Sequence, residues 1–105
     1  MDSQNTSIQK KVFTVIRKIP RGKVVTYKGV AKAIGNPLAS RAVGNALHRN
    51  PHPIQIPCHR VVKSDGTLGG YALGEEKKKQ LLENEGVIFT DKNKIDVLCI
   101  VRNLR

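Results

Sequence analysis

A short stretch containing one proline and one cysteine constrains this chain more than any other feature. Residues 54–62 read I-Q-I-P-C-H-R-V-V, so Cys58 and His59 follow Pro57 between two short apolar runs. Proline fixes its own φ and biases the preceding residue toward an extended conformation. We therefore expect a short strand over residues 54–56 and a turn at the cysteine that holds its thiol in the wall of a pocket.

The chemistry of Cys58 depends on whether its thiol ionises. A nearby imidazole or helix N-terminus lowers the pKa of a thiol from about 8.5 into the range of roughly 3.5 to 7.5. Adjacency alone does not make Cys58 and His59 a catalytic pair, because a buried structural cysteine beside a polar residue is the ordinary case. Cys99 lies in an apolar run and is expected in the core.

Two cysteines do not form a disulfide framework, and no secretory or transmembrane segment is recognisable. We therefore expect a reducing intracellular location, cytoplasmic or, in a eukaryote, nuclear, and no membrane partner. The chain has 105 residues, with 19 Lys+Arg against 8 Asp+Glu and a net charge of +11. That length suits one domain over residues 1–105, and that charge suits a polyanionic partner. The spacing of His48 and His52 from Cys58 matches no zinc template, so no metal is expected.

Helical spacing dominates the first half of the chain. Thr6 to Gln9 reads as a capping box with Thr6 as N-cap, and apolar residues at 8, 12, 15, 16 and 19 predict a helix over residues 7–18. Thr26 is suited to cap a second helix that ends at residue 33 or 34 before Gly35. Asn36 is suited to cap a third, with Pro37 as its first residue and an end near residue 48 or 49. Two helices joined by Gly-Asn-Pro indicate a helix-turn-helix.

The third helix has an unusual composition for a DNA-reading element. Val43 and Leu47 lie four residues apart and should pack inward. Its other face combines Arg41 with small residues, namely Ala39, Ser40, Ala42, Gly44 and Asn45. Most helix-turn-helix proteins read bases in the major groove with long polar side chains. Small residues with one arginine better suit close entry into a narrow groove.

The second half predicts short strands, a loop and one more helix. We expect a strand over residues 60–63, a tight turn over 64–67 and a glycine-rich loop over 68–74 that wraps a ligand. A charged amphipathic helix over 75–85 should turn Leu81 and Leu82 inward. Residues 87–89 and 95–101 suit a hairpin, although a helix for the last segment stays open. The predicted fold is mainly α with short strands, a compact single domain containing a helix-turn-helix (winged-helix-like) and an active-site loop.

Several segments, in one order, resemble a known family. I-P-C-H-R-V is similar to the active-site segment of the O6-alkylguanine-DNA alkyltransferases (methylated-DNA–protein-cysteine methyltransferases). The other matching segments are V-V-T-Y at 24–27, G-N-P-L-A-S-R-A-V-G-N-A-L at 35–47, N-P at 50–51, G-G-Y at 69–71 and L-L-E-N-E-G at 81–86. The resemblance covers roughly residues 7–86. Related alkyltransferase-like proteins replace the cysteine, whereas this chain keeps Cys58.

The resemblance implies direct DNA repair. The alkyl group of O6-alkylguanine in double-stranded DNA would move to the sulfur of Cys58, once per molecule, without metal or organic cofactor. The protein would bind the minor groove as a monomer and flip the damaged base, at an unstacking cost of a few kcal/mol. The family commonly carries a second, N-terminal domain. Only the residues before position 7 precede the first helical pattern, so we expect that domain to be absent.

The resemblance also implies roles for single residues. His59 would take the thiol proton through water, while Glu85 orients it and favours imidazolium. Tyr27 would donate to N3 of the departing base. Arg41 would be the arginine finger that occupies the space of the flipped nucleotide.

The hinge and the base pocket follow from the same resemblance. Asn50 would be the hinge that joins the DNA-binding helix to the active-site segment. Backbone groups of Cys58, Val61 and Ala72 would bond the base edge, with Tyr71 as a wall of the pocket. Arg60 is expected to be structural and to pair with a helix end or a carboxylate.

Three other functions compete with alkyl transfer. A non-enzymatic sensor would flip and hold alkylguanine and recruit other repair factors, but the retained Cys58 argues against it. A helix-turn-helix transcription factor would need base-reading side chains that the third helix largely lacks. A cysteine hydrolase would need an oxyanion loop that the sequence does not indicate.

Overall fold

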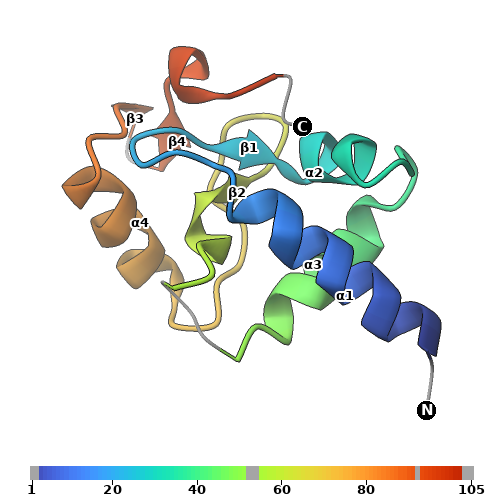
Figure 1. Cartoon of the computed structure of the whole chain (residues 1–105). Coiled ribbons are helices and arrows are strands. Elements are labelled where there is room, and N and C mark those ends of the chain that lie inside the picture. The colour runs from blue at the N-terminus through green and yellow to red at the C-terminus, as the bar shows by residue number, and fades with distance from the viewer. Residues whose placement is uncertain (1–2, 52–54, 92, 103–105) are drawn as a thin grey trace.

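The computed structural model describes residues 3–51, 55–91 and 93–102 and forms helices joined by very short strands (Figure 1). The helices are α1 (Ser3–Ile16), α2 (Tyr27–Ala33), α3 (Ser40–His48) and α4 (Glu75–Asn84), with 3₁₀ turns at Cys58–Arg60 and Val97–Cys99. The strands are β1 (Val25–Thr26), β2 (Val61–Val62), β3 (Phe89–Asp91) and β4 (Lys94–Ile95). The predicted fold class, mainly α with short strands, is confirmed.

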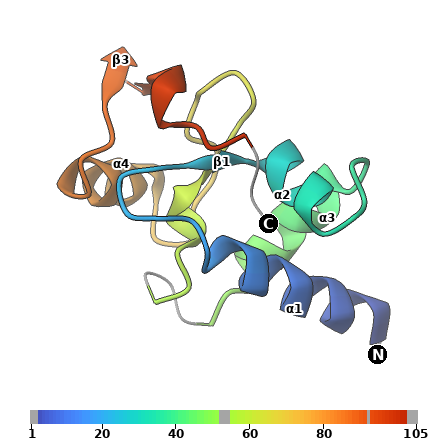
Figure 2. The same cartoon turned by 45° about the horizontal axis from the view of Figure 1, so that its top comes forward.

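The two strands β1 and β2 lie between a group of three helices and a smaller group formed by one helix and a hairpin. Helices α1, α2 and α3 pack on one side, and α4 with the β3–β4 hairpin lies on the other (Figures 1 and 2). The β1–β2 pair is parallel, with Val25 opposite Val61 and Thr26 opposite Val62. Strand β1 directly precedes α2, and β2 directly follows the turn that contains Cys58. Their pairing therefore fixes the cysteine turn relative to α2.

The helix-turn-helix forms as the sequence predicts in its first half. The Thr26 hydroxyl accepts a hydrogen bond from the Gly29 backbone N–H at 2.9 Å and caps α2. Gly35 follows the helix with φ +87°, a conformation that glycine adopts without a Cβ penalty. Val43 and Leu47 are buried on α3, as their spacing predicts.

Two predicted helix starts are wrong. Helix α1 begins at Ser3, so Thr6 lies inside the helix and cannot be its N-cap. Helix α3 begins at Ser40 with Ala39 in the cap position, instead of starting at Pro37. The Asn36 side chain accepts a hydrogen bond from the Leu38 N–H at 3.3 Å. This local bond closes a turn before the helix, an alternative that asparagine offers to the backbone.

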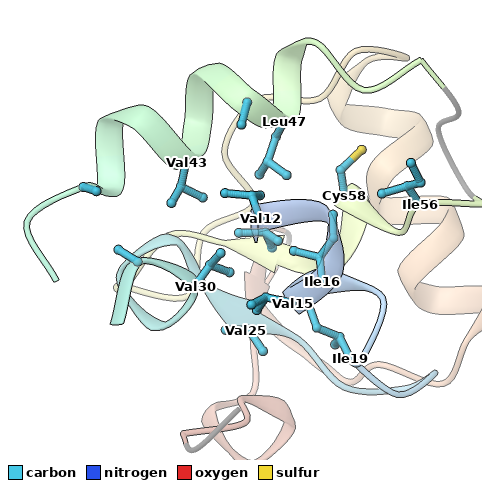
Figure 3. Packing of buried hydrophobic residues seen from close by; sticks show 14 residues of the cluster. Val12, Val15, Ile16, Ile19, Val25, Val30, Val43, Leu47, Ile56 and Cys58 are labelled. Atoms are coloured by element: carbon cyan, nitrogen blue, oxygen red, sulfur yellow. The ribbon is translucent and has the colours of Figure 1, made fainter. Parts of the chain in front are cut away.

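The main hydrophobic core joins α1, α2 and α3 to the cysteine turn. Val12, Ile16 and Val30 are fully buried in it. Figure 3 shows Cys58 at the edge of this cluster beside Ile56, with its sulfur directed away from Val12 and Ile16. The core therefore anchors the backbone and Cβ of Cys58, while its sulfur points out of the cluster.

The second core cluster lies under α4 and the C-terminal residues. Leu82 is fully buried there, whereas Leu81 is only half-buried. The turn over residues 64–67 forms as predicted, with Gly66 at φ +89° and the Lys63 N–H bonded to the Thr67 carbonyl. Cys99 is buried in this cluster, which confirms its place in the core.

The C-terminal hairpin is shorter than predicted. Strands β3 and β4 are antiparallel with an irregularity in their register, and the next residues form the 3₁₀ turn Val97–Cys99. The Asp96 side chain accepts from the Leu98 N–H at 2.9 Å, which favours the turn over a continued strand. Of the predicted strand over residues 54–56, Ile54 lies outside the described residues, as does His52. None of the helices among the described residues has the length and apolar character needed to span a bilayer.

Candidate active site

A cavity of about 430 Å³ opens in front of Cys58. Its volume falls in the range of small-molecule sites, about 300–1,000 Å³. It lies between α3, the start of α2, the cysteine turn and the loop that precedes α4. Its lining residues are Tyr27, Ser40, Arg41, Gly44, Asn45, Leu47, His48, Cys58, Lys63, Gly70, Tyr71 and Ala72. The predicted pocket beside the cysteine is therefore present.

Cys58 lines this cavity although only 4% of its surface is exposed. The Asn50 side-chain amide donates to the Cys58 sulfur at 3.2 Å and to the Ile56 carbonyl at 2.9 Å. Asn50 is itself buried, so it fixes the end of α3 to the cysteine turn, the place that the hinge prediction gave it. Burial raises the pKa of the Cys58 thiol, while the Asn50 hydrogen bond and the charge of Lys78 oppose that rise. The resting thiol is therefore neutral at pH 7.

His59 and Arg60 both bond the carboxylate of Glu85, which follows α4. His59 Nε2 lies 3.0 Å from Glu85 Oε2, and Arg60 donates through Nε at 2.9 Å and Nη2 at 2.8 Å. Arg60 Nη1 also donates to the Ile19 carbonyl at 2.7 Å. The structural role predicted for Arg60 is confirmed. These bonds tie the cysteine turn to the C-cap of α4 and to the loop that follows α1.

The Glu85 contact determines which ring nitrogen of His59 carries the proton. Hydrogen bonds from Arg60 and His59 outweigh the effect of burial and lower the pKa of Glu85, so its carboxylate is ionised and can only accept. Neutral His59 must then carry its hydrogen on Nε2, which leaves Nδ1 with a free lone pair. Nδ1 is buried and has no hydrogen-bond partner among the described residues. It is the nitrogen that can receive a proton.

Glu85 favours the imidazolium form of His59, as expected, but burial outweighs that effect. His59 is fully buried, and burial lowers its pKa below the ordinary value despite the opposing effect of Glu85. Arg60 and Lys78 lower that pKa further. The ring is thus neutral at pH 7 in the resting protein, and Glu85 acts by orienting it.

Two tyrosines form part of the cavity wall. Tyr27 begins α2, and its pKa is raised, mainly by burial, so its hydroxyl keeps its proton. Tyr71 packs edge-on against the His59 ring, with centroids 6.3 Å apart. Burial raises the pKa of Tyr71 to about 12, and its hydroxyl has no hydrogen-bond partner among the described residues. Both hydroxyls are therefore proton donors at neutral pH.

The face of α3 that borders the cavity is narrower than the sequence predicts. Ser40, Arg41, Gly44 and Asn45 line the cavity, but two of the predicted DNA-binding residues lie elsewhere. Ala39 is buried in the main core, and Ala42 packs against that core half-buried. Ser40 and Gly44, like Arg41 and Asn45, are four residues apart and share the cavity side of the helix, whereas Ala42 falls on another side.

The predicted base-pocket residues also divide. Tyr71 and Ala72 line the cavity, whereas Val61, which was predicted to act through its backbone, is fully buried in the main core. The Val61 N–H donates to the Cys58 carbonyl and closes the cysteine turn. Within the described residues, no three His, Cys, Asp or Glu side chains gather as a metal site would require.

Sequence reasoning missed Lys78, the fully buried lysine of α4. Its spacing was the available signal, because Lys78, Leu82 and Glu85 are separated by four and three residues and share one helix face. Its Nζ donates to the carbonyls of Leu68 and Gly70, which flank the loop of the cavity.

The family model for the DNA-binding domain of 6-O-methylguanine DNA methyltransferase matches residues 7–87. The chain belongs to this family. A methylated-DNA–protein-cysteine methyltransferase from Methanosarcina acetivorans is 51% identical to this member over 83 residues, which are 79% of this chain and 53% of that protein. The chain thus spans about half the length of the curated relatives it matches.

Solved structures of DNA complexes share the fold of this 6-O-methylguanine DNA methyltransferase family member. S. pombe Atl1 in complex with damaged DNA containing O6-carboxymethylguanine has a TM-score of 0.77 and 34% identity, covering 89% of this chain and 92% of that one. Mycobacterium tuberculosis OGT in complex with DNA has a TM-score of 0.72 and 44% identity, covering 73% of this chain and 47% of that one.

Proposed function

We propose that this chain repairs DNA by moving the alkyl group of O6-alkylguanine to the sulfur of Cys58. The observation that carries the proposal is the position of Cys58, which lines a cavity of about 430 Å³ and is followed in the chain by a histidine that Glu85 orients. A cysteine with a purely structural role would not need such a cavity. Membership of the 6-O-methylguanine DNA methyltransferase family supports the same reaction.

The transfer forms a sulfur–carbon bond and breaks the carbon–O6 bond in line. Because the resting thiol is neutral, it must lose its proton as the reaction proceeds, and the thiolate is the nucleophile. The free lone pair on His59 Nδ1 can take that proton through water, with Glu85 fixing the ring. The electron pair of the broken bond passes to guanine, which leaves as an anion and is protonated. Tyr27 lines the cavity, and its hydroxyl would donate that proton.

The cysteine ends as a thioether, so one molecule repairs one base. Access to the O6 atom requires the base to leave the DNA stack, and the cavity is the place for the extruded base. Arg41, exposed on α3 at the cavity, would fill the vacated space in the duplex. The net charge of +11 supplies affinity for phosphates that does not depend on sequence and that weakens with salt.

The second candidate function is a damage sensor that binds O6-alkylguanine in DNA without reacting. The structural likeness to Atl1 bound to DNA with O6-carboxymethylguanine, over most of both chains, favours it. The presence of Cys58 in the cavity favours transfer.

Incubation with a duplex containing O6-methylguanine separates the two functions. The transferase gains the mass of one methyl group on the intact protein, while the Cys58→Ala variant binds the duplex and gains none. Tight binding by the wild-type protein with no gain in mass would establish the sensor and refute transfer.

The role of Arg41 is tested by Arg41→Ala against Arg17→Ala, a matched loss of charge on an exposed residue away from the cavity. We expect slower transfer from duplex DNA with Arg41→Ala only, and a much smaller deficit on single-stranded DNA. Equal transfer rates for the two variants on duplex DNA would show that Arg41 takes no part in base flipping.

A further inference from the structure

The last residues of the described chain pair with the backbone just before β1. Val24, the residue that precedes β1, donates its N–H to the Cys99 carbonyl at 2.9 Å, and the Val101 N–H donates to the Val24 carbonyl at 2.8 Å. These two bonds flank Ile100, which bridges Val24 in the parallel sense. The family match ends at residue 87, so this C-terminal segment lies beyond the matched domain.

The parallel pairing sets the direction in which the C-terminal segment runs. Because β1 leads directly into α2, the paired segment also runs toward the start of α2 (Figure 2). Cys99 and Ile100 are buried in the second core cluster and anchor the segment. Arg102 follows two residues later and is exposed. The fold therefore carries a cation from the far end of the chain to the side of α2.

Arg102 lines a cleft of about 310 Å³ beside α2. The lining residues of this cleft are Thr26, Lys28, Gly29, Lys32, Ser64, Ile100, Val101 and Arg102. Lysine and arginine supply all the charged side chains among these described residues, and none of them is acidic. Asp65 follows Ser64, but its carboxylate accepts from the N–H and the hydroxyl of Thr67 and so serves its own turn. The charge of the cleft favours an anionic ligand.

The cleft adjoins the cavity in front of Cys58. Tyr27 lines the cavity and Lys28 lines the cleft, and in the same way Lys63 lines the cavity and Ser64 lines the cleft. A duplex that places an extruded base in the cavity therefore carries its sugar–phosphate backbone past the cleft. Phosphate is the anion that DNA offers there, and arginine and lysine are its common partners in proteins.

We propose that the C-terminal segment, residues 99–102, completes a separate DNA contact, in which Arg102 with Lys28 and Lys32 binds a backbone phosphate beside the cavity. The inference rests on the proposed function for the presence of DNA at the cavity, and it adds a contact that does not depend on the damaged base. Because a phosphate carries no sequence information, this contact strengthens binding to damaged and intact duplexes alike. It also increases the salt dependence of binding, since neutralising a phosphate releases counterions.

Arg102→Ala tests the contact, with Arg17→Ala as the matched control. Both residues are exposed and both changes remove one positive charge, but Arg17 follows α1 and does not line the cleft. Binding to a short duplex without damage is measured by fluorescence anisotropy over a range of salt concentrations, so the readout requires no alkyl transfer. The same duplex, ethylated at random on its phosphates, shows which phosphates each protein needs.

We expect Arg102→Ala to bind the intact duplex about 3- to 10-fold more weakly at about 0.1 M salt, with a slope of log K against log salt that is smaller by about 1. Ethylation of one phosphate should weaken binding by the wild type and have no effect on binding by Arg102→Ala. Arg17→Ala should keep the wild-type slope and the wild-type ethylation pattern. Either an unchanged salt slope or an unchanged ethylation pattern for Arg102→Ala overturns the proposal.

Val101→Pro tests whether the pairing with Val24 positions Arg102. Proline removes the N–H that bonds the Val24 carbonyl and leaves Arg102 in the sequence, whereas Val101→Ala keeps that N–H. A Val101→Pro variant that is folded by circular dichroism should show the same loss as Arg102→Ala, and Val101→Ala should bind like the wild type. Wild-type binding by the folded proline variant overturns the role of the segment. If the proline variant does not fold, the Arg102→Ala comparison decides the proposal.

The proposed function and this contact fail in different experiments. A wild-type protein that transfers no methyl group would refute the proposed function alone, because binding to the intact duplex would still report on Arg102. Equal binding by the wild type and Arg102→Ala would overturn the contact and leave alkyl transfer to Cys58 untouched.

Discussion

Replacing Glu85 by glutamine is expected to remove about 3 kcal/mol from the free energy of unfolding. The carboxylate accepts two hydrogen bonds from Arg60 and one from His59, and its side chain is only 8% exposed. An amide has one accepting oxygen, and its NH₂ group would face the donors that now meet the second carboxylate oxygen. The substitution therefore leaves the guanidinium without its ion partner.

The size of the loss follows from the surroundings of Arg60. Removing one partner of a buried ion pair costs about 3–5 kcal/mol. Arg60 is 16% exposed and keeps its bond to the Ile19 carbonyl, so it regains some hydration and the lower end of that range applies. A domain of this size has a total stability of about 5–15 kcal/mol, so the variant should remain folded and measurable.

The assay is urea unfolding followed by circular dichroism at pH 7.5, with Glu83→Gln as the control. Glu83 is the exposed carboxylate two residues earlier, and its substitution should change stability by less than about 0.5 kcal/mol. The Glu85 variant should also transfer methyl more slowly, because the His59 ring loses its fixed orientation. Equal unfolding midpoints for the two variants would refute the account of this ion pair.

Three further predictions concern the pH dependence of stability, the loop and the thiol. Because burial holds the pKa of His59 below its unfolded value, stability should be full above about pH 6.5 and decrease as the pH falls below it; a constant urea midpoint down to pH 5 would contradict this. Gly69→Ala should slow methyl transfer, since its Cβ would lie 3.0 Å from the Tyr27 hydroxyl oxygen at a φ of +75°, and wild-type kinetics would show that the contact is unimportant. Asn50→Ala should raise the pKa of Cys58 by removing a hydrogen bond to its sulfur, which the pH dependence of iodoacetamide modification measures; an unchanged midpoint would argue against that bond.

Local signals in the sequence were sufficient for much of the fold. Thr26 and Gly35 mark the two ends of α2 because a hydroxyl cap and a positive φ are properties of single residues. The start of α3 could not be found this way. Asn36 is suited both to cap a helix and to close a turn, and packing of Ala39 into the main core accompanies the turn. The parallel pairing of β1 with β2 joins distant segments, and no local pattern specifies it.

Local sequence patterns also leave part of the candidate site unspecified. The motif and family resemblance placed Cys58, Tyr27 and Tyr71 at one cavity. They did not give the protonation state of His59, which depends on how completely the fold buries the ring. Lys78 lies in a segment predicted only as a charged amphipathic helix, and composition cannot tell which lysine of a run faces inward.

The location of the transferred methyl group tests the central claim most directly. The protein has two cysteines, and Cys99 is buried in the second core cluster, away from the cavity residues. After incubation with a duplex containing O6-methylguanine, peptide mapping by mass spectrometry should find one methyl on Cys58, none on Cys99, and unmodified guanine in the DNA. Restored guanine with an unmodified Cys58, or a methyl group on any other residue, would contradict the account.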